Sequence, residues 1–248
     1  MNQRLITNWK KDEKAHFEGW DFSYLKGRMI EDKLPWNYIK LAREFSKKSE
    51  NMLDMGTGGG EILLQIKPAA KKIIATEGYP PNVIVARKNL KKLKVKVFDF
   101  SKHNVKKMPF PDDSFDLIIN RHDAYDLDEV YRILKPNGIF LTQQVGTGNL
   151  RNLKKFFGVE SRFKGMSLKD QIPLFKKAGF KILKKKEFTG NYHFKDVGAL
   201  VYYLHAIPWV VKDFSVDSHK NYLLKLNKRK EIEFALKRFL IVARKEGE

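Results

Sequence analysis

Three glycines at alternate positions follow an apolar run in the stretch LDMGTGGGE, residues 53–61. Glycine tolerates positive φ and places no β-carbon between the backbone and a ligand. A strand-to-helix turn built on Gly56, Gly58 and Gly60 can therefore lie directly against an adenosine-bearing molecule. The spacing predicts a cofactor loop, and an ordinary tight turn is the alternative.

The residue after the third glycine distinguishes two kinds of cofactor. Dinucleotide-binding loops follow G-x-G-x-x-G, and their last glycine permits tight packing of the helix beside a pyrophosphate. Glu61 occupies that sixth position here. A carboxylate repels a pyrophosphate but tolerates a ligand that carries an ammonium and a sulfonium. The spacing D-x-G-x-G-x-G from Asp54 resembles motif I of the class I S-adenosylmethionine (SAM) dependent methyltransferases.

Two further strand ends place acidic residues where such a cofactor needs them. Residues 72–76 are predicted to be a buried strand that ends at Glu77, 21 positions after Gly56. An acidic residue at about this distance accepts hydrogen bonds from ribose hydroxyls. The next predicted strand, residues 95–98, ends in Asp99 and Phe100, where related methyltransferases place an acidic group on the adenine amine and an apolar one against the ring.

Two more segments add to the resemblance. MPFPDDSFDLIIN (residues 108–120) is similar to the family's "PFPDxSFDxV" region, and LKPNG (residues 134–138) to its "LKPGG" turn. All these segments stand at the carboxyl ends of predicted strands, where open α/β sheets bind ligands. The resemblance assigns the cofactor site to Asp54, Gly56, Thr57, Gly58, Gly60, Glu61, Glu77, Gly78, Asp99, Phe100 and Asn120.

The resemblance implies an α/β, Rossmann-like mixed sheet of seven strands with helices on both faces. The implied strand order is 3-2-1-4-5-7-6, with strand seven antiparallel between strands five and six. Residues 180–183 and 238–244 are the expected strands six and seven. Residues 1–48 are expected to form an N-terminal helical cap, and residues 49–248 the SAM-dependent domain, with a cap insertion at 189–237 before the last strand.

Composition favours a soluble cytoplasmic protein. The chain has 248 residues, 42% of them hydrophobic, and it lacks any run approaching the roughly 18 apolar residues that span a bilayer. It contains no cysteine, which excludes disulfides, thiolate zinc sites and cysteine-bound iron–sulfur clusters. The absence of cysteine also excludes the covalent thiolate nucleophile that C5-pyrimidine methylation requires. No metal is expected.

The formal charge of +20 raises the question of a nucleic-acid partner. Most of the basic excess lies in residues 151–248, with clusters at residues 184–186 and 228–230. Such clusters can follow a phosphate backbone, so rRNA or tRNA is a possible acceptor. A lysine-rich solvated surface is the alternative, because lysine predominates over arginine and no RNA-binding module accompanies the charge.

All four tryptophans lie in the flanks, outside residues 50–150. The flanks are therefore expected to form a cap that excludes water from the methyl donor, although core packing alone would also explain their aromatic residues. The stretches HFEGWDFS (residues 16–23) and IPWVV (residues 207–211) resemble a bacterial branch of class I methyltransferases whose acceptor is not assigned. The residues expected to contact the acceptor are His16, Trp20, Tyr24, Trp36, Tyr203 and Trp209.

The predicted reaction transfers a methyl group to an oxygen, nitrogen or carbon atom of a small-molecule acceptor. His122, just past the fourth predicted strand, is a candidate general base, or else a structural hydrogen-bonding group. Arg121 is a candidate for binding an acidic group of the acceptor, or else a partner of Asp123 or Asp126. An RNA methyltransferase and a non-catalytic SAM-binding protein are the alternative functions.

Overall fold

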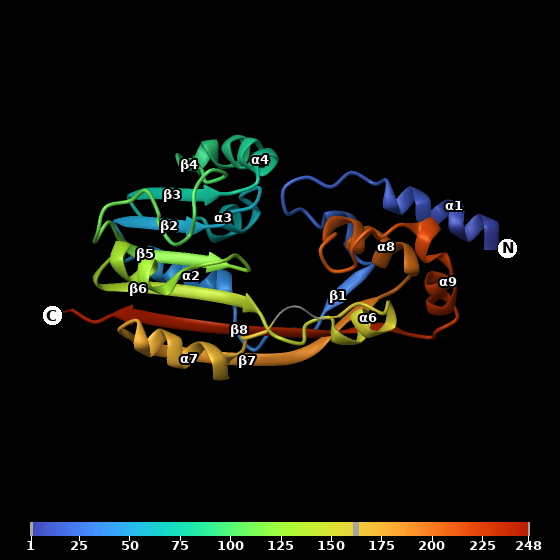
Figure 1. Ribbon diagram of the computed structural model, residues 1–248. Helices are drawn as coiled ribbons and strands as arrows, with labels where there is room; N and C mark the ends of the chain where they lie inside the picture. Colours follow the sequence, from blue (N-terminus) through green and yellow to red (C-terminus); the bar gives the residue numbers. More distant parts are fainter. Residues whose placement is uncertain (1, 161–163, 248) are drawn as a thin grey trace.

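The structure is a computed structural model that describes residues 2–160 and 164–247. One mixed sheet carries helices on both faces, and a helical lobe lies at the far end of its two longest strands (Figure 1). The strands are β1 (Met29–Glu31), β2 (Asn51–Met55), β3 (Lys72–Glu77), β4 (Lys96–Asp99), β5 (Phe115–Arg121), β6 (Leu134–Val145), β7 (Phe180–Phe194) and β8 (Ile232–Lys245).

The helices follow the expected start and stop signals. Asn37, Asp126, Ser167, Asp196 and Ser215 each cap a helix by accepting a backbone N–H with the side chain. The helices are α1 (Asn2–Glu13), α2 (Tyr38–Ser46), α3 (Glu61–Ile66), α4 (Pro80–Leu90), α5 (Leu127–Ile133), α6 (Arg151–Phe156), α7 (Leu168–Lys177), α8 (Val197–Ala206) and α9 (Val216–Asn227), with 3-10 turns at η1 (Ser23–Leu25) and η2 (Lys91–Leu93).

The strand order confirms the predicted topology and adds one strand. The order β4-β3-β2-β5-β6-β8-β7 corresponds to 3-2-1-4-5-7-6, and β8 runs antiparallel between β6 and β7. The eighth strand, β1, pairs with the outer edge of β7 from Met29↔Phe194 to Glu31↔Tyr192. The sheet thus has eight strands where seven were expected, and the N-terminal segment contributes a strand as well as helices. A long edge strand such as β7 has unpaired backbone N–H and C=O groups, and β1 supplies hydrogen-bond partners for some of them.

The last two strands are much longer than expected. β7 continues past Leu183 to Phe194, and β8 begins at Ile232, so the inserted helices connect two strand ends that pair with each other. The predicted insertion at 189–237 is thus too wide at both ends. Lys184–Lys186 interrupt the apolar pattern because this part of β7 is exposed, and antiparallel strands with a solvated face do not need a continuous apolar run.

Two apolar clusters cover the two faces of the sheet. On one face Met52 and Leu240 pack with side chains of α2, α3 and α4. On the other Leu53 and Phe140 pack with side chains of α5 and α7. A fully buried side chain of this size stabilises the fold by about 1.5–3 kcal/mol. The sheet is therefore held rigidly enough to position the loops at its carboxyl edge.

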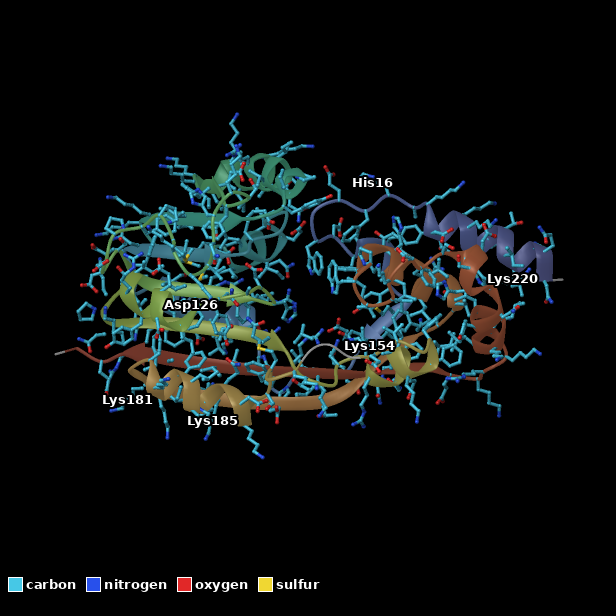
Figure 2. All side chains as sticks on the ribbon, in the orientation of Figure 1. His16, Asp126, Lys154, Lys181, Lys185 and Lys220 are labelled. Carbon is cyan, nitrogen blue, oxygen red and sulfur yellow. The ribbon has the colours of Figure 1, made fainter. Side chains whose placement is uncertain are left out.

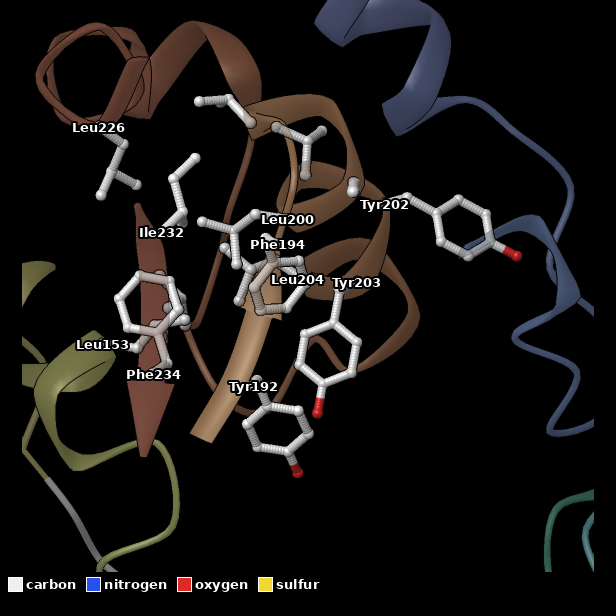
Figure 3. Close-up of a cluster of buried hydrophobic side chains, with 14 of the residues drawn as sticks. Leu153, Tyr192, Phe194, Leu200, Tyr202, Tyr203, Leu204, Leu226, Ile232 and Phe234 are labelled. Carbon is white, nitrogen blue, oxygen red and sulfur yellow. The ribbon is translucent and has the colours of Figure 1, made fainter. Parts of the chain in front are cut away.

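The helical lobe has its own core around α8 (Figure 3). Nearly every residue of α8 is buried, because α1 and α9 cover it on one side and β7 and β8 on the other. The rings of Tyr192 and Tyr203 extend from this cluster with both hydroxyls on the same side (Figure 3). Within residues 2–160 and 164–247, no helix is both long and apolar enough to cross a membrane.

The lobe depends on one partly buried ionic junction. Arg28 donates to Asp12 of α1 at 2.8 Å and to both carboxylate oxygens of Asp196, the N-cap of α8, at 2.6 and 3.0 Å. We expect Arg28→Met to lower the free energy of unfolding by about 1–3 kcal/mol, because two carboxylates lose a charged donor. Urea unfolding followed by circular dichroism measures this loss.

The control is Lys71→Met, which breaks a pair between Lys71 and Glu50 whose side chains are 76% and 65% exposed. Ion pairs in solvent contribute little, so the control should unfold at the wild-type urea concentration. Equal effects of the two substitutions would show that the Arg28 junction does not hold the lobe.

Candidate functional site

The glycine-rich turn leaves β2 at the carboxyl edge of the sheet and leads into α3. Gly56, Gly58 and Gly60 have φ values of 69°, 62° and 88°. The amide of Thr57 donates to the carbonyl of Thr76 on β3, and the amide of Gly60 to the carbonyl of Thr57. Positive φ at all three positions explains why this turn needs glycine.

The space around the three glycines differs. A β-carbon on Gly56 would lie 2.2 Å from the carboxylate of Asp123, and one on Gly58 would lie 3.2 Å from Cβ of Trp20. A β-carbon on Gly60 would lie 2.7 Å from the side chain of Leu90 on α4. The space beside Gly56 is thus taken by Asp123 and the space beside Gly58 by Trp20, whereas Gly60 lets α3 pack closely against α4.

Glu77 fixes the turn from the neighbouring strand. It ends β3, and its two carboxylate oxygens accept the backbone N–H groups of Gly58 and Tyr79, each at 2.7 Å. The side chain is buried at 8% exposure. Each oxygen keeps a second lone pair, so the contacts seen here leave room for the predicted bonds from ribose hydroxyls.

Three carboxylates converge on the turn. Burial raises the pKa of Asp54 to about 7, and the nearby charges of Asp123 and Glu77 add to that rise. Burial also raises the pKa of Glu77 and that of Asp123. Among the described residues none of the three forms an ion pair. Such a cluster disfavours a pyrophosphate and suits a cationic ligand, and the sulfonium and ammonium of SAM meet that requirement.

The remaining predicted adenine contacts lie at the same edge. Asp99 pairs with Glu77 in the β3–β4 ladder, and its exposed carboxylate accepts the N–H of Ser101 at 2.9 Å. Phe100 is half-buried and stacks on His103. Gly78 is exposed, with open space where a β-carbon would stand. The turns after β2, β3 and β4 thus form one continuous rim.

Asn120, which was predicted to contact the cofactor, is hydrogen-bonded within the protein. It is fully buried at the end of β5, and its Oδ1 accepts from Thr142 Oγ1 at 3.1 Å and Gln144 Nε2 at 2.5 Å. Its Nδ2 donates to the carbonyl of Ala124 at 3.5 Å. All these partners are protein groups, so the Asn120 side chain shapes the turn that carries Asp123.

The N-terminal segment closes over the glycine-rich turn. The backbone N–H of Trp20 donates to Oε1 of Glu61 at 2.8 Å, so Glu61 anchors this segment to the first residue of α3. The Trp20 ring stacks on Trp209, with centroids 5.9 Å apart and planes 7° apart. Trp20 and Trp209 come from opposite ends of the sequence, and together they form the part of the cap nearest the turn.

His16 and Tyr24 lie outside this contact. They line a groove of about 500 Å³ between the N-terminal segment and α4, together with Glu18, Asp21 and Glu61. The hydroxyl of Tyr24 donates to Asp12, and its ring stacks on Tyr202. His16 is 84% exposed, and Figure 2 places it on the loop between the sheet and the lobe. The residues predicted to contact the acceptor are therefore divided between this groove and the inner side of the cap.

On the inner side, Trp36, Gln143 and His122 form a hydrogen-bonded chain. Trp36 Nε1 can only donate, and it donates to Gln143 Oε1 at 2.7 Å. The amide nitrogen of Gln143 then faces Nε2 of His122 at 3.1 Å and donates to it. The proton of the neutral imidazole consequently lies on Nδ1.

This arrangement does not support the predicted general-base role of His122. The Nε2 lone pair is already used, and burial together with the charges of Arg121 and Arg238 holds the pKa of His122 well below its usual value. The residue adopts a left-handed φ of 63° directly after β5. His122 therefore presents a hydrogen-bond donor.

Arg121, the last residue of β5, forms none of the ion pairs considered from the sequence. Among the described residues neither Asp123 nor Asp126 accepts a hydrogen bond from its guanidinium. Asp126 instead caps α5, and the side chain of Asp123 packs against Gly56. Arg121 and the cofactor turn are thus close in the fold without being paired.

Sequence reasoning missed four residues of this site. Gln143 and Gln144 are polar residues within the buried strand β6, and Arg238 stands within the apolar strand β8. These interruptions of apolar strands were the available signal. Asp123 follows His122 directly, and its carboxylate type at a strand end was a second signal.

Comparison with known proteins agrees with this geometry. The family described as "Methyltransferase domain" matches residues 46–196, more than half of the chain. The uncharacterized methyltransferase YcgJ of Bacillus subtilis is 30% identical over 138 residues, which cover 53% of this chain and 49% of that protein. Demethylmenaquinone methyltransferase of Thermus thermophilus is 27% identical over 114 residues, covering 42% of this chain and 51% of that protein. The chain spans about half the length of these two relatives.

Solved structures share the fold. The crystal structure of YcgJ superposes with a TM-score of 0.56 at 20% identity, covering 85% of this chain and 99% of that one. A SAM-dependent methyltransferase of Methanosarcina mazei superposes with a TM-score of 0.54 at 16% identity, covering 88% of this chain and 100% of that one. The chain therefore belongs to the methyltransferase domain family.

Proposed function

We propose that this protein transfers the methyl group of SAM to a small-molecule acceptor at the carboxyl edge of its sheet. The observation that carries the proposal is the convergence of Asp54, Glu77 and Asp123 on a turn of positive-φ glycines. A cationic adenosyl ligand satisfies both features, because it compensates the carboxylates and lies flat against a backbone without β-carbons.

Different residues of the rim are expected to bind different parts of the cofactor. Glu77 is expected to accept from the ribose hydroxyls and Asp99 from the adenine amine, with Phe100 against the ring. Gly56 and Gly58 are half-buried, so part of their backbone is exposed to the rest of the cofactor. When bound, the cofactor supplies an electrophilic methyl group on its sulfonium.

The contribution of the chain to the reaction is placement and exclusion of water. Trp20 and Trp209 cover the glycine-rich turn, and Trp36, Gln143 and His122 form an ordered wall beside it. Holding two reactants in line can lower a barrier by about 7–11 kcal/mol. The wall donates hydrogen bonds to an acceptor and offers no free base, which favours an acceptor atom that is already nucleophilic when it binds.

The lysine distribution favours a small molecule over RNA. Lys184–Lys186 are exposed on β7, and Lys181 and Lys185 project outward from that strand, whereas Lys220 projects from the other end of the molecule (Figure 2). A nucleic-acid track would instead gather such charges into one stripe leading to the cofactor turn.

The cofactor assignment predicts a loss of SAM binding on changing the turn or its anchor. Glu77→Gln leaves a single amide oxygen to accept from the two backbone N–H groups of Gly58 and Tyr79. Gly58→Val places a branched side chain at φ 62° against Trp20. We expect calorimetry to show SAM affinity reduced about 10- to 100-fold in each variant.

The matched control is Glu50→Gln, an acid-to-amide change at an exposed residue near the opposite end of β2. It should bind SAM as the wild type does. Unchanged binding in both folded site variants would remove the glycine-rich turn as the cofactor site.

The raised pKa of Asp54 predicts pH-dependent binding. A cation favours ionised Asp54, so SAM binding lowers this pKa from about 7 and releases a proton. The affinity should therefore rise about tenfold between pH 6 and pH 8. Calorimetry in buffers of different ionisation enthalpy measures both effects, and Asp54→Asn should flatten the profile. A wild-type affinity independent of pH contradicts the proposed charge compensation.

The acceptor class is tested by release of S-adenosylhomocysteine (SAH). The protein is incubated with SAM and either the small-molecule filtrate of a bacterial extract or purified total RNA. We expect SAH release with the filtrate, none with RNA, and none with the Gly58→Val variant. Release only with RNA contradicts the small-molecule acceptor, and no release with either favours a SAM-binding protein without transfer activity.

A further inference from the structure

Arg121 is a guanidinium without a carboxylate partner at the end of β5. Among the described residues it forms no side-chain hydrogen bond or ion pair, whereas Arg28, Arg132 and Arg238 each donate to an acceptor. Removing a guanidinium from water without a partner costs free energy, and binding an anion offsets that cost.

The strand register places Arg121 beside the cofactor turn. Met55 pairs with Asn120 in the β2–β5 ladder, so Arg121 stands one residue further along β5, at the level of Gly56. Asp123, two residues later, packs against Gly56 itself. An anion bound by Arg121 would thus lie near the methyl-transfer position but on the acceptor side.

A second arginine backs the first from across β6. Arg121 pairs with Gln143 and Arg238 with Val145, and alternate residues of β6 point to the same face of the sheet. Arg238 donates to Tyr192 Oη at 2.5 Å, to Asn149 Oδ1 at 2.9 Å and to a backbone carbonyl. All these acceptors are neutral, so the positive charge of Arg238 is not compensated by its partners.

Arg121 and Arg238 place two positive charges on one face of the sheet beside the cofactor turn. Arg121 and His122 are half-buried, and partial removal from water lowers the pKa of both. Glu31 of β1 is exposed and attracts both arginines without forming an ion pair with either, and Arg121 also acts at a distance on the buried Asp54. Neither arginine is paired with a carboxylate among the described residues.

We propose that Arg121, backed by Arg238, binds a carboxylate of the methyl acceptor. A planar carboxylate matches a single free guanidinium with two parallel hydrogen bonds, whereas a phosphate dianion calls for more than one free donor group. The inference rests on the proposed function, because it names the substrate class of the same site. It makes Arg121 a residue that selects acidic acceptors and orients them towards the cofactor.

The test uses small probes on the SAH-saturated protein. Benzoate, benzamide and phenyl phosphate are titrated by calorimetry into the wild type and into Arg121→Gln, Arg121→Lys and Arg4→Gln. Arg4 is exposed on α1, so Arg4→Gln has the same change in charge away from the site. We expect wild type to bind benzoate about tenfold or more tightly than benzamide, as for a charge-assisted pair.

The variants separate charge from geometry. Arg121→Gln should bind benzoate no better than benzamide, Arg121→Lys should bind it with intermediate affinity, and Arg4→Gln should match the wild type. Equal binding of benzoate and benzamide by wild type, or unchanged benzoate binding in Arg121→Gln, overturns the proposal. Tighter binding of phenyl phosphate than of benzoate overturns the carboxylate assignment.

A failure of the proposed function is recognised separately. SAH binding is titrated first in every protein, and the benzoate titration is repeated without SAH. Failure of the wild type to bind SAH counts against the cofactor site. Normal SAH binding without a preference for benzoate over benzamide counts only against the role of Arg121.

Discussion

Crowding of negative charge at the start of α3 is the constraint on which the site depends. Asp54 lies near the end of a core strand, Glu77 ends its neighbour, and Asp123 lies on the turn after β5, so three separate segments bring carboxylates to one backbone turn. Asp54 and Glu77 are buried, and a buried carboxylate needs a compensating partner. The backbone N–H groups around Glu77 compensate part of this charge, and a cationic cofactor compensates the rest.

The cap is coupled to the same turn through a fourth acidic residue. Glu61 receives the backbone N–H of Trp20, and Trp20 rests on both Gly58 and Trp209. The covering residues therefore touch the backbone that the cofactor is expected to touch. Trp20 and Glu61 thus link the N-terminal part of the cap to the turn.

The sequence predicted what depends on local pattern. The glycine spacing, the acidic residue after β3 and the order of the core strands follow from short-range signals, and the structure contains all of them. β1 and the outer halves of β7 and β8 were missed, because their pairing depends on residues distant in the sequence, and in β7 the exposed Lys184–Lys186 also interrupt the apolar pattern. The surroundings of His122 likewise depend on distant residues, since Trp36 sets its tautomer through Gln143, and they do not support the predicted base role.

The long ladder between β7 and β8 gives the cap an unusual independence. The inserted segment leaves from Phe194 and returns at Ile232, which are paired neighbours, so its two ends are fixed whatever lies between them. Evolution can exchange or enlarge such a segment without disturbing the strands that carry the glycine-rich turn. Acceptor preference can then diverge among homologues while the machinery for the methyl donor is inherited intact.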